Sequence, residues 1–150
     1  MSITKILSRG ISTLPAGSVL QVTQLVSGTL FNTNSTSFVT TGIEHSITPS
    51  SASNKILIMI QGYCGVFGGS AQTQGLAIYK STTKLYESSG TYNGNTNQGN
   101  SFSLIYLDSP STTSSTTYTL RTKINAATAN AYIAPDDVAD TTITLMEIAV

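Results

Sequence analysis

The chain has 150 residues, of which 39% are hydrophobic and 9% charged, and its seven basic and seven acidic residues cancel. It is therefore long enough for one domain with a core, and it lacks the basic excess of a protein that binds nucleic acid through its phosphates. Ser (21) and Thr (24) dominate the polar residues, and because Thr is a β-branched strand former the composition favours β structure over disorder.

The first segment, Met1–Leu14, is a short apolar arm that ends where Pro15-Ala16-Gly17 interrupts the chain. Burial of its aliphatic side chains is favourable, so we expect the arm to dock on a partner surface. Lys5 and Arg9 are followed by no apolar stretch of the length of a signal peptide, so none is expected. The docking side chains are Ile3, Ile6, Leu7, Ile11 and Leu14.

Residues 15–150 are predicted to form one all-β domain. Strand-like runs recur about every ten to fifteen residues between Gly, Pro, Asn and Ser clusters, which is typical of an antiparallel β-sandwich. We expect eight or nine strands and no internal repeat: Ser18–Leu25, Thr36–Ile47, Lys55–Cys64, Gly75–Lys80, Lys84–Glu87, Ser101–Asp108, Thr116–Asn125, Asn130–Ile133 and Thr141–Val150.

Two of these strands are apolar on both alternating faces. In Lys55–Cys64, Ile56, Ile58 and Ile60 alternate with Leu57 and Met59, and Thr141–Val150 has a similar pattern. A strand that is apolar on both faces is typically covered on both. One face fills the sandwich, and a second copy of the chain is the simplest cover for the other, which predicts a homo-oligomer.

The Ser/Thr-rich stretch Ser101–Ile124 is predicted to be two strands and a short connection. Asp108-Ser109-Pro110 ends the first strand, because Pro cannot donate to the sheet and Asp favours turns. In the second strand, Tyr118, Leu120 and Ile124 alternate with polar residues. This strand is therefore expected to have one face in the core and one face exposed to solvent.

The loop Ser88–Ser101 is rich in Asn and Gly. Amides can pair with sugar hydroxyls and an aromatic ring can stack on a sugar, so it is either a ligand loop or an ordinary polar loop of a sandwich. Its candidate ligand residues are Tyr92, Asn93, Asn95 and Asn97.

No catalytic residue, metal site or cofactor is expected. Asp136, Asp137 and Asp140 could hold a hard cation, but they lack the spacing of a calcium loop, and the sequence leaves open whether they bind an ion. His45 is expected at the edge of the core or at an interface, hydrogen-bonded, and the lone Cys64 as a buried thiol. The scarce acids include no glycosidase pair, and the longest aliphatic run is far too short for a membrane span.

Four segments carry a resemblance to a known group of proteins: LPAGSVLQVTQ, SFVTTGIEHSITPSSASNKILIMIQG, SFSLIYLDSPSTTSSTTYTLRTKI and TTITLMEIAV. In their order and spacing they resemble small virion proteins and tail-fibre domains of tailed bacteriophages, especially phages of cyanobacteria and marine bacteria. The resemblance implies a jelly roll like that of tumour necrosis factor, with a central final strand and three-fold association. Met146, Ile148 and Val150 would then lie near the trimer interface.

The expected function is that of a non-enzymatic virion protein, a homotrimeric decoration (cement) protein whose arm clamps the major capsid protein. A short apolar arm joined to one head domain fits that role better than a fibre. The alternative is a tail-fibre or receptor-binding protein that recognises a host surface glycan through its loops.

Overall fold

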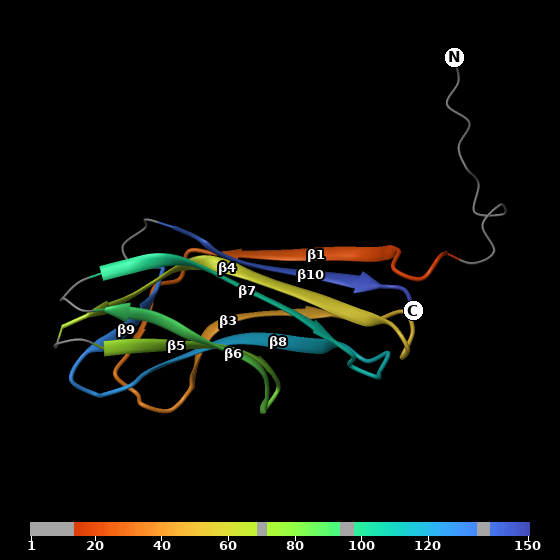
Figure 1. Cartoon of the computed structure of the whole chain (residues 1–150). Helices are drawn as coiled ribbons and strands as arrows, with labels where there is room; N and C mark the ends of the chain where they lie inside the picture. Colours follow the sequence, from red (N-terminus) through yellow and green to blue (C-terminus); the bar gives the residue numbers. More distant parts are fainter. Residues whose placement is uncertain (1–13, 69–71, 94–97, 135–138) are drawn as a thin grey trace, which may run out of the picture.

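The computed structural model describes residues 14–68, 72–93, 98–134 and 139–150, and for 89–93 and 98 it describes the backbone alone (Figure 1). These residues form ten strands, one or two more than expected: β1 (Val19–Ser27), β2 (Phe31–Thr33), β3 (Val39–Ile47), β4 (Lys55–Phe67), β5 (Gln72–Lys80), β6 (Thr83–Asn93), β7 (Gln98–Asp108), β8 (Thr116–Ile124), β9 (Asn130–Ile133) and β10 (Thr141–Ile148).

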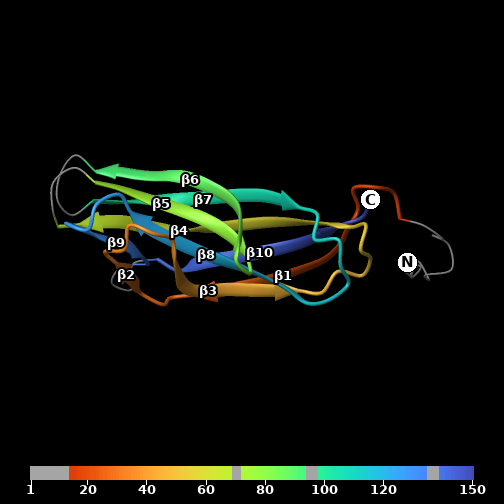
Figure 2. The same ribbon diagram turned by 90° about the horizontal axis from the view of Figure 1, so that it is seen from below.

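The strands form two antiparallel sheets that are stacked face to face (Figures 1 and 2). Sheet A has six strands in the order β1-β10-β4-β9-β2, with β7 paired to the other side of β4. The long strand β4 pairs with β10 along residues 55–61 and with β9 along residues 64–67. Sheet B has four strands in the order β3-β8-β5-β6. The prediction of an all-β sandwich is confirmed.

The strand pairs are nested in the sequence. The innermost pair is β5 with β6, followed outward by β4 with β7, β3 with β8, β2 with β9 and β1 with β10. The chain is thus one long hairpin folded across two sheets, which is the topology of a jelly roll. β10 lies between β1 and β4, which agrees with the central final strand that the resemblance implied.

The core lies between the sheets and is made of alternate residues of the interior strands. Ile56, Ile58 and Ile60 of β4 are fully buried, and so are Ile143 and Leu145 of β10. On the sheet B side the expected alternation of β8 is confirmed, because its core face is fully buried: Tyr118, Leu120, Thr122 and Ile124. Burial of each large aliphatic side chain contributes roughly 1.5–3 kcal/mol.

Two parts of the chain differ from the sequence-based expectation. Strand β2 is missing from the expected set, because three residues paired only with β9 are too few to show a periodic pattern. The predicted loop Ser88–Ser101 instead contains the end of β6 and the start of β7. Its Asn and Gly residues suggested a loop, but the strands there are paired through backbone groups, which any residue except Pro supplies.

Candidate interaction surface

The outer face of sheet A, which points away from sheet B, is apolar across four strands. Two neighbouring rows cross β1, β10, β4 and β7 in that order: Val22–Met146–Leu57–Leu107 and Gln24–Thr144–Met59–Ile105. We call the six apolar members of these rows the apolar face: Val22, Leu57, Met59, Ile105, Leu107 and Met146.

The apolar face is partly open to solvent in the single chain. Val22 and Ile105, on the two edge strands, are 54% and 55% exposed, and Leu107 is 47% exposed. The central side chains of Leu57 and Met146 are half-buried. The two rows contain no charged residue, and an exposed apolar area of this continuity marks a site of interaction with another molecule.

A buried carboxylate holds β10 beneath one end of this face. Glu147 points inward and is fully buried, and it accepts hydrogen bonds from Asn54 Nδ2 (2.7 Å), Gln21 Nε2 (2.6 Å) and both the backbone N and Oγ of Ser50 (2.7 Å each). Burial alone would raise the pKa of Glu147, but the donors from Asn54, Gln21 and Ser50 outweigh it and lower the pKa to about 2. The carboxylate thereby ties the β3–β4 connection to β1 and β10.

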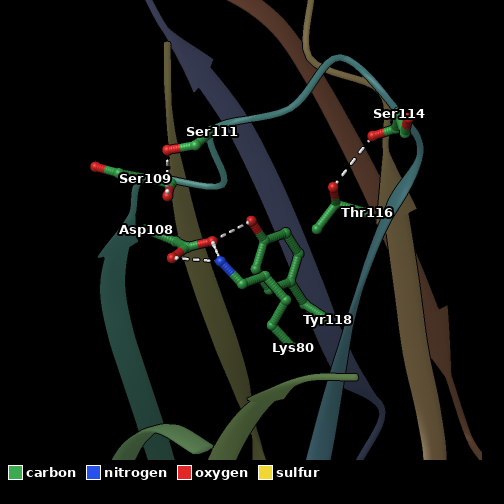
Figure 3. A network of polar contacts seen from close by, with 7 residues as sticks. All are labelled: Lys80, Asp108, Ser109, Ser111, Ser114, Thr116 and Tyr118. Atoms are coloured by element: carbon green, nitrogen blue, oxygen red, sulfur yellow. Dashed lines mark hydrogen bonds and ion pairs between the residues drawn. The ribbon is translucent and has the colours of Figure 1, made fainter. Parts of the chain in front are cut away.

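A second polar network joins the two sheets at the end of β7 (Figure 3). Asp108 of sheet A accepts hydrogen bonds from Lys80 Nζ (2.8 and 3.1 Å) and from the buried Tyr118 hydroxyl (2.8 Å) of sheet B. Burial and donation to the Asp108 carboxylate raise the pKa of Tyr118 far above its ordinary value. The expected end of the strand at Asp108-Ser109-Pro110 is confirmed, and the buried acid fixes where the following connection begins.

The residues predicted for the oligomer interface lie on or near the apolar face. Met146 belongs to it, and Ile148 is the next outward residue of β10, opposite Val19 of β1. Val150 follows the strand and is 65% exposed. The second face of β4 and β10 is thus partly exposed in the single chain.

The predicted arm lies mostly outside the described residues. Ile3, Ile6, Leu7 and Ile11 lie outside the described residues, whereas Leu14 is described and is 51% exposed. The described chain starts beside its C-terminal end, because Gly17 N donates to Ala149 O (2.8 Å) and Ala149 N to Ser18 O (2.9 Å).

The predicted ligand loop is only partly described. The backbone of Tyr92 and Asn93 belongs to β6, where it pairs with Thr73 and Gln72 of β5, and Asn95 and Asn97 lie outside the described residues. The structure therefore corrects the expectation of a loop at Tyr92 and Asn93, which are strand residues.

Other candidate residues form no site together. Asp136 and Asp137 lie outside the described residues, and Asp140 is exposed. Within the described ranges, no group of three or more His, Cys, Asp or Glu side chains could hold a metal ion. His45 is half-buried at the edge strand β3, as expected for the edge of the core, and its buried Nε2 has no hydrogen-bond partner in the described chain.

Sequence reasoning missed part of the apolar face. Val22 and Leu107 were not among the predicted interface residues, although each lies in a predicted strand with apolar residues of both parities. Such a pattern indicates that both faces of the strand are apolar, but it does not indicate which face points outward. Register across β1, β10, β4 and β7 is what joins these residues into one surface. As for the membrane, no helix long and apolar enough to cross one occurs in the described residues.

Two stacked antiparallel sheets with nested strand pairs define the class: this is a jelly-roll domain, a fold found in viral capsid proteins among others. No protein-family model matches the chain, and no curated protein sequence matches it.

Solved structures that resemble the chain come from infectious bursal disease virus. The Gx strain structure has a TM-score of 0.56 at 10% identity and covers 97% of this chain. The VP2 subviral particle has a TM-score of 0.52 at 10% identity over 97% of this chain, and the T13 viral particle 0.51 at 11% over all of it. The chain spans only 36%, 37% and 40% of those proteins. At such identities the likeness shows the fold alone, a jelly-roll β-sandwich like that of these viral proteins.

Proposed function

We propose that this chain is a non-enzymatic structural protein of a tailed-phage virion, a homotrimer that decorates and reinforces the head. The observation that carries the proposal is the apolar face on a jelly roll of viral capsid type. An uncharged, exposed sheet face is not complementary to a charged partner, whereas a second copy of this net-neutral chain provides an equally uncharged surface. Three-fold association follows the bacteriophage resemblance described above.

The proposed mechanism is mass action on the assembled head. The arm, Met1–Leu14, docks its aliphatic side chains on the major capsid protein, and a protein that binds assembled subunits but not free ones stabilises the assembly. Three arms on one trimer bind together more tightly than one arm alone, because the second and third contacts are intramolecular.

The proposal is tested by mass and by binding. Light scattering should give a mass three times that of the 15.7 kDa chain. The full chain should bind expanded, undecorated heads, and deletion of residues 1–14 should abolish that binding while the trimer persists.

The controls separate the two candidate roles. Host cells are offered to the same two proteins. Strong binding of cells by the truncated protein, together with unimpaired head binding, would favour the receptor-binding alternative over decoration. A stable monomer would contradict the role assigned to the apolar face.

A further inference from the structure

On the opposite side of the molecule, the outer face of sheet B carries an open hollow of about 720 Å³. β3 and β8 form its floor, the β5–β6 turn forms one wall, and the β7–β8 connection forms the other. This volume lies in the range of small-molecule sites, roughly 300–1,000 Å³. The lining, however, consists mostly of hydroxyl side chains, including Thr40, Ser81, Thr112, Thr117 and Thr119.

Two charged side chains of this hollow, Glu44 and Arg121, have contacts within the chain but are not paired with each other. Glu44 Oε2 accepts a hydrogen bond from the buried Thr119 (3.3 Å). Arg121 lies over the Tyr79 ring at 4.1 Å and donates from Nη2 to Ser81 O (3.0 Å). Arg121 Nε is buried and has no hydrogen-bond partner in the described chain. The hollow thus presents a carboxylate acceptor and a guanidinium donor, of which Arg121 is held by two contacts.

The walls are also held by local contacts. Thr112 Oγ1 accepts from Ser114 N (3.0 Å). Thr116 Oγ1 donates to Ser114 O (3.1 Å), as Figure 3 shows. Ser81, whose carbonyl accepts from Arg121, has a positive φ of 54°. The backbone of Ser81 therefore has a conformation that Ser rarely adopts, and its carbonyl accepts a hydrogen bond from Arg121.

We propose that the hollow binds a neutral saccharide. A carboxylate accepts from sugar hydroxyls, a guanidinium donates to them, and threonine hydroxyls do both. The balance of charge in the hollow favours a neutral ligand. Lys80 is neutralised by its ion pair with Asp108 (2.8 Å), so Glu44 and Arg121 remain as one acid and one base. The open shape suits a chain of sugars at a surface, and the lining offers hydroxyl groups to sugar hydroxyls.

The test uses the full, isotope-labelled chain and three neutral probes, namely maltohexaose, cellohexaose and N-acetylchitohexaose, with dextran sulfate as an acidic comparison. At least one neutral probe should shift the backbone amide signals of Glu44, Thr119 and Arg121. Calorimetry with that probe should show that Glu44→Gln weakens binding roughly tenfold, because a charge-assisted hydrogen bond is lost.

The matched control is Glu87→Gln. Glu87 lies on sheet B but outside the hollow, where it pairs with Lys123 (3.0 Å) and Lys84, so its loss should leave the affinity unchanged. Three results would overturn the proposal: no shift of these amides at millimolar concentrations of all three probes, equal weakening by both substitutions, or tighter binding of dextran sulfate than of every neutral probe.

Discussion

At the scale of single residues, the two buried acids lie on the same row of sheet A. Register places Glu147 opposite Ile56, and Ile56 opposite Asp108, all pointing inward. At this end of the core, Glu147 therefore holds the β3–β4 connection and Asp108 holds sheet B. Both are surrounded by donors, which is how a buried carboxylate avoids the cost of lost hydration.

The Glu147 network makes stability depend on pH in a known direction. The folded pKa of about 2 lies below the ordinary value of 4.5, so the stabilisation is complete above pH 4.5 and is lost as the pH falls through 2. Glu147→Gln should lower the free energy of unfolding at pH 7 by about 3 kcal/mol, on the order of what that pKa difference implies.

Chemical denaturation followed by circular dichroism checks this expectation. The stability difference between the natural chain and Glu147→Gln should shrink steadily from pH 5 to pH 2.5, because the Glu147 carboxyl is present only in the natural chain and the other carboxyl groups titrate in both. A difference that stays constant over that range would show that the network does not set the pKa. Glu87→Gln, an exposed acid, serves as the control and should change stability at pH 7 far less.

At the scale of elements, β4 and β7 form a pairing that tolerates no side chain at one position. A Cβ at Gly99 would clash with the Tyr63 ring and lie 2.8 Å from the backbone oxygen of Cys64. Gly99→Ala should therefore lower the free energy of unfolding by about 2 kcal/mol, as overpacking does.

Gly28→Ala is the matched control for this substitution. A Cβ there would meet only the exposed Asp140 carboxylate, at 3.0 Å, which can move aside. Urea denaturation of both variants should show a clearly smaller loss for Gly28→Ala. Equal losses of stability in the two variants would mean that the clash at Gly99 does not determine the effect of Gly99→Ala.

The elements also show what the sequence could predict. β4, β8 and β10 carry strong alternation or continuous apolar residues, and their positions are confirmed to within a few residues. The prediction of a loop at Ser88–Ser101 is wrong for the described residues that extend β6 and β7, because their backbone pairing with β5 and β4 depends on residues distant in sequence. The apolar face was predictable as a second apolar side of two strands, but its extent across β1 and β7 depends on register, which no single strand encodes.

At the scale of the whole molecule, the proposed burial of the apolar face between copies predicts that thermal stability depends on concentration. The midpoint of thermal unfolding should rise with protein concentration, because association stabilises only the folded chain. Met146→Lys places a charge in the centre of the apolar face and should remove this dependence while the strands still form. Scanning calorimetry over a hundredfold range of concentration measures both.

Ser46→Lys is the control for that charge. Ser46 is exposed on β3, in sheet B, on the side of the molecule away from the apolar face. Its midpoint should keep the concentration dependence of the natural chain. Loss of the dependence in both variants would mean that the effect is general charge repulsion and not burial of Met146.

The nested order of strand pairs bears on how the chain reaches this structure. β5 and β6 are joined by a two-residue turn. Closing this short loop costs the least conformational entropy, so this pair is the most favourable starting point for folding. Each inner pair then brings the next two strands together, and this shortens the effective loop that the outer pair must close. β1 has no sheet partner except β10 in the described chain. During synthesis sheet A therefore stays incomplete until β10 has emerged from the ribosome, and Val22 and Met146 join the apolar face only when β10 pairs with β1 and β4.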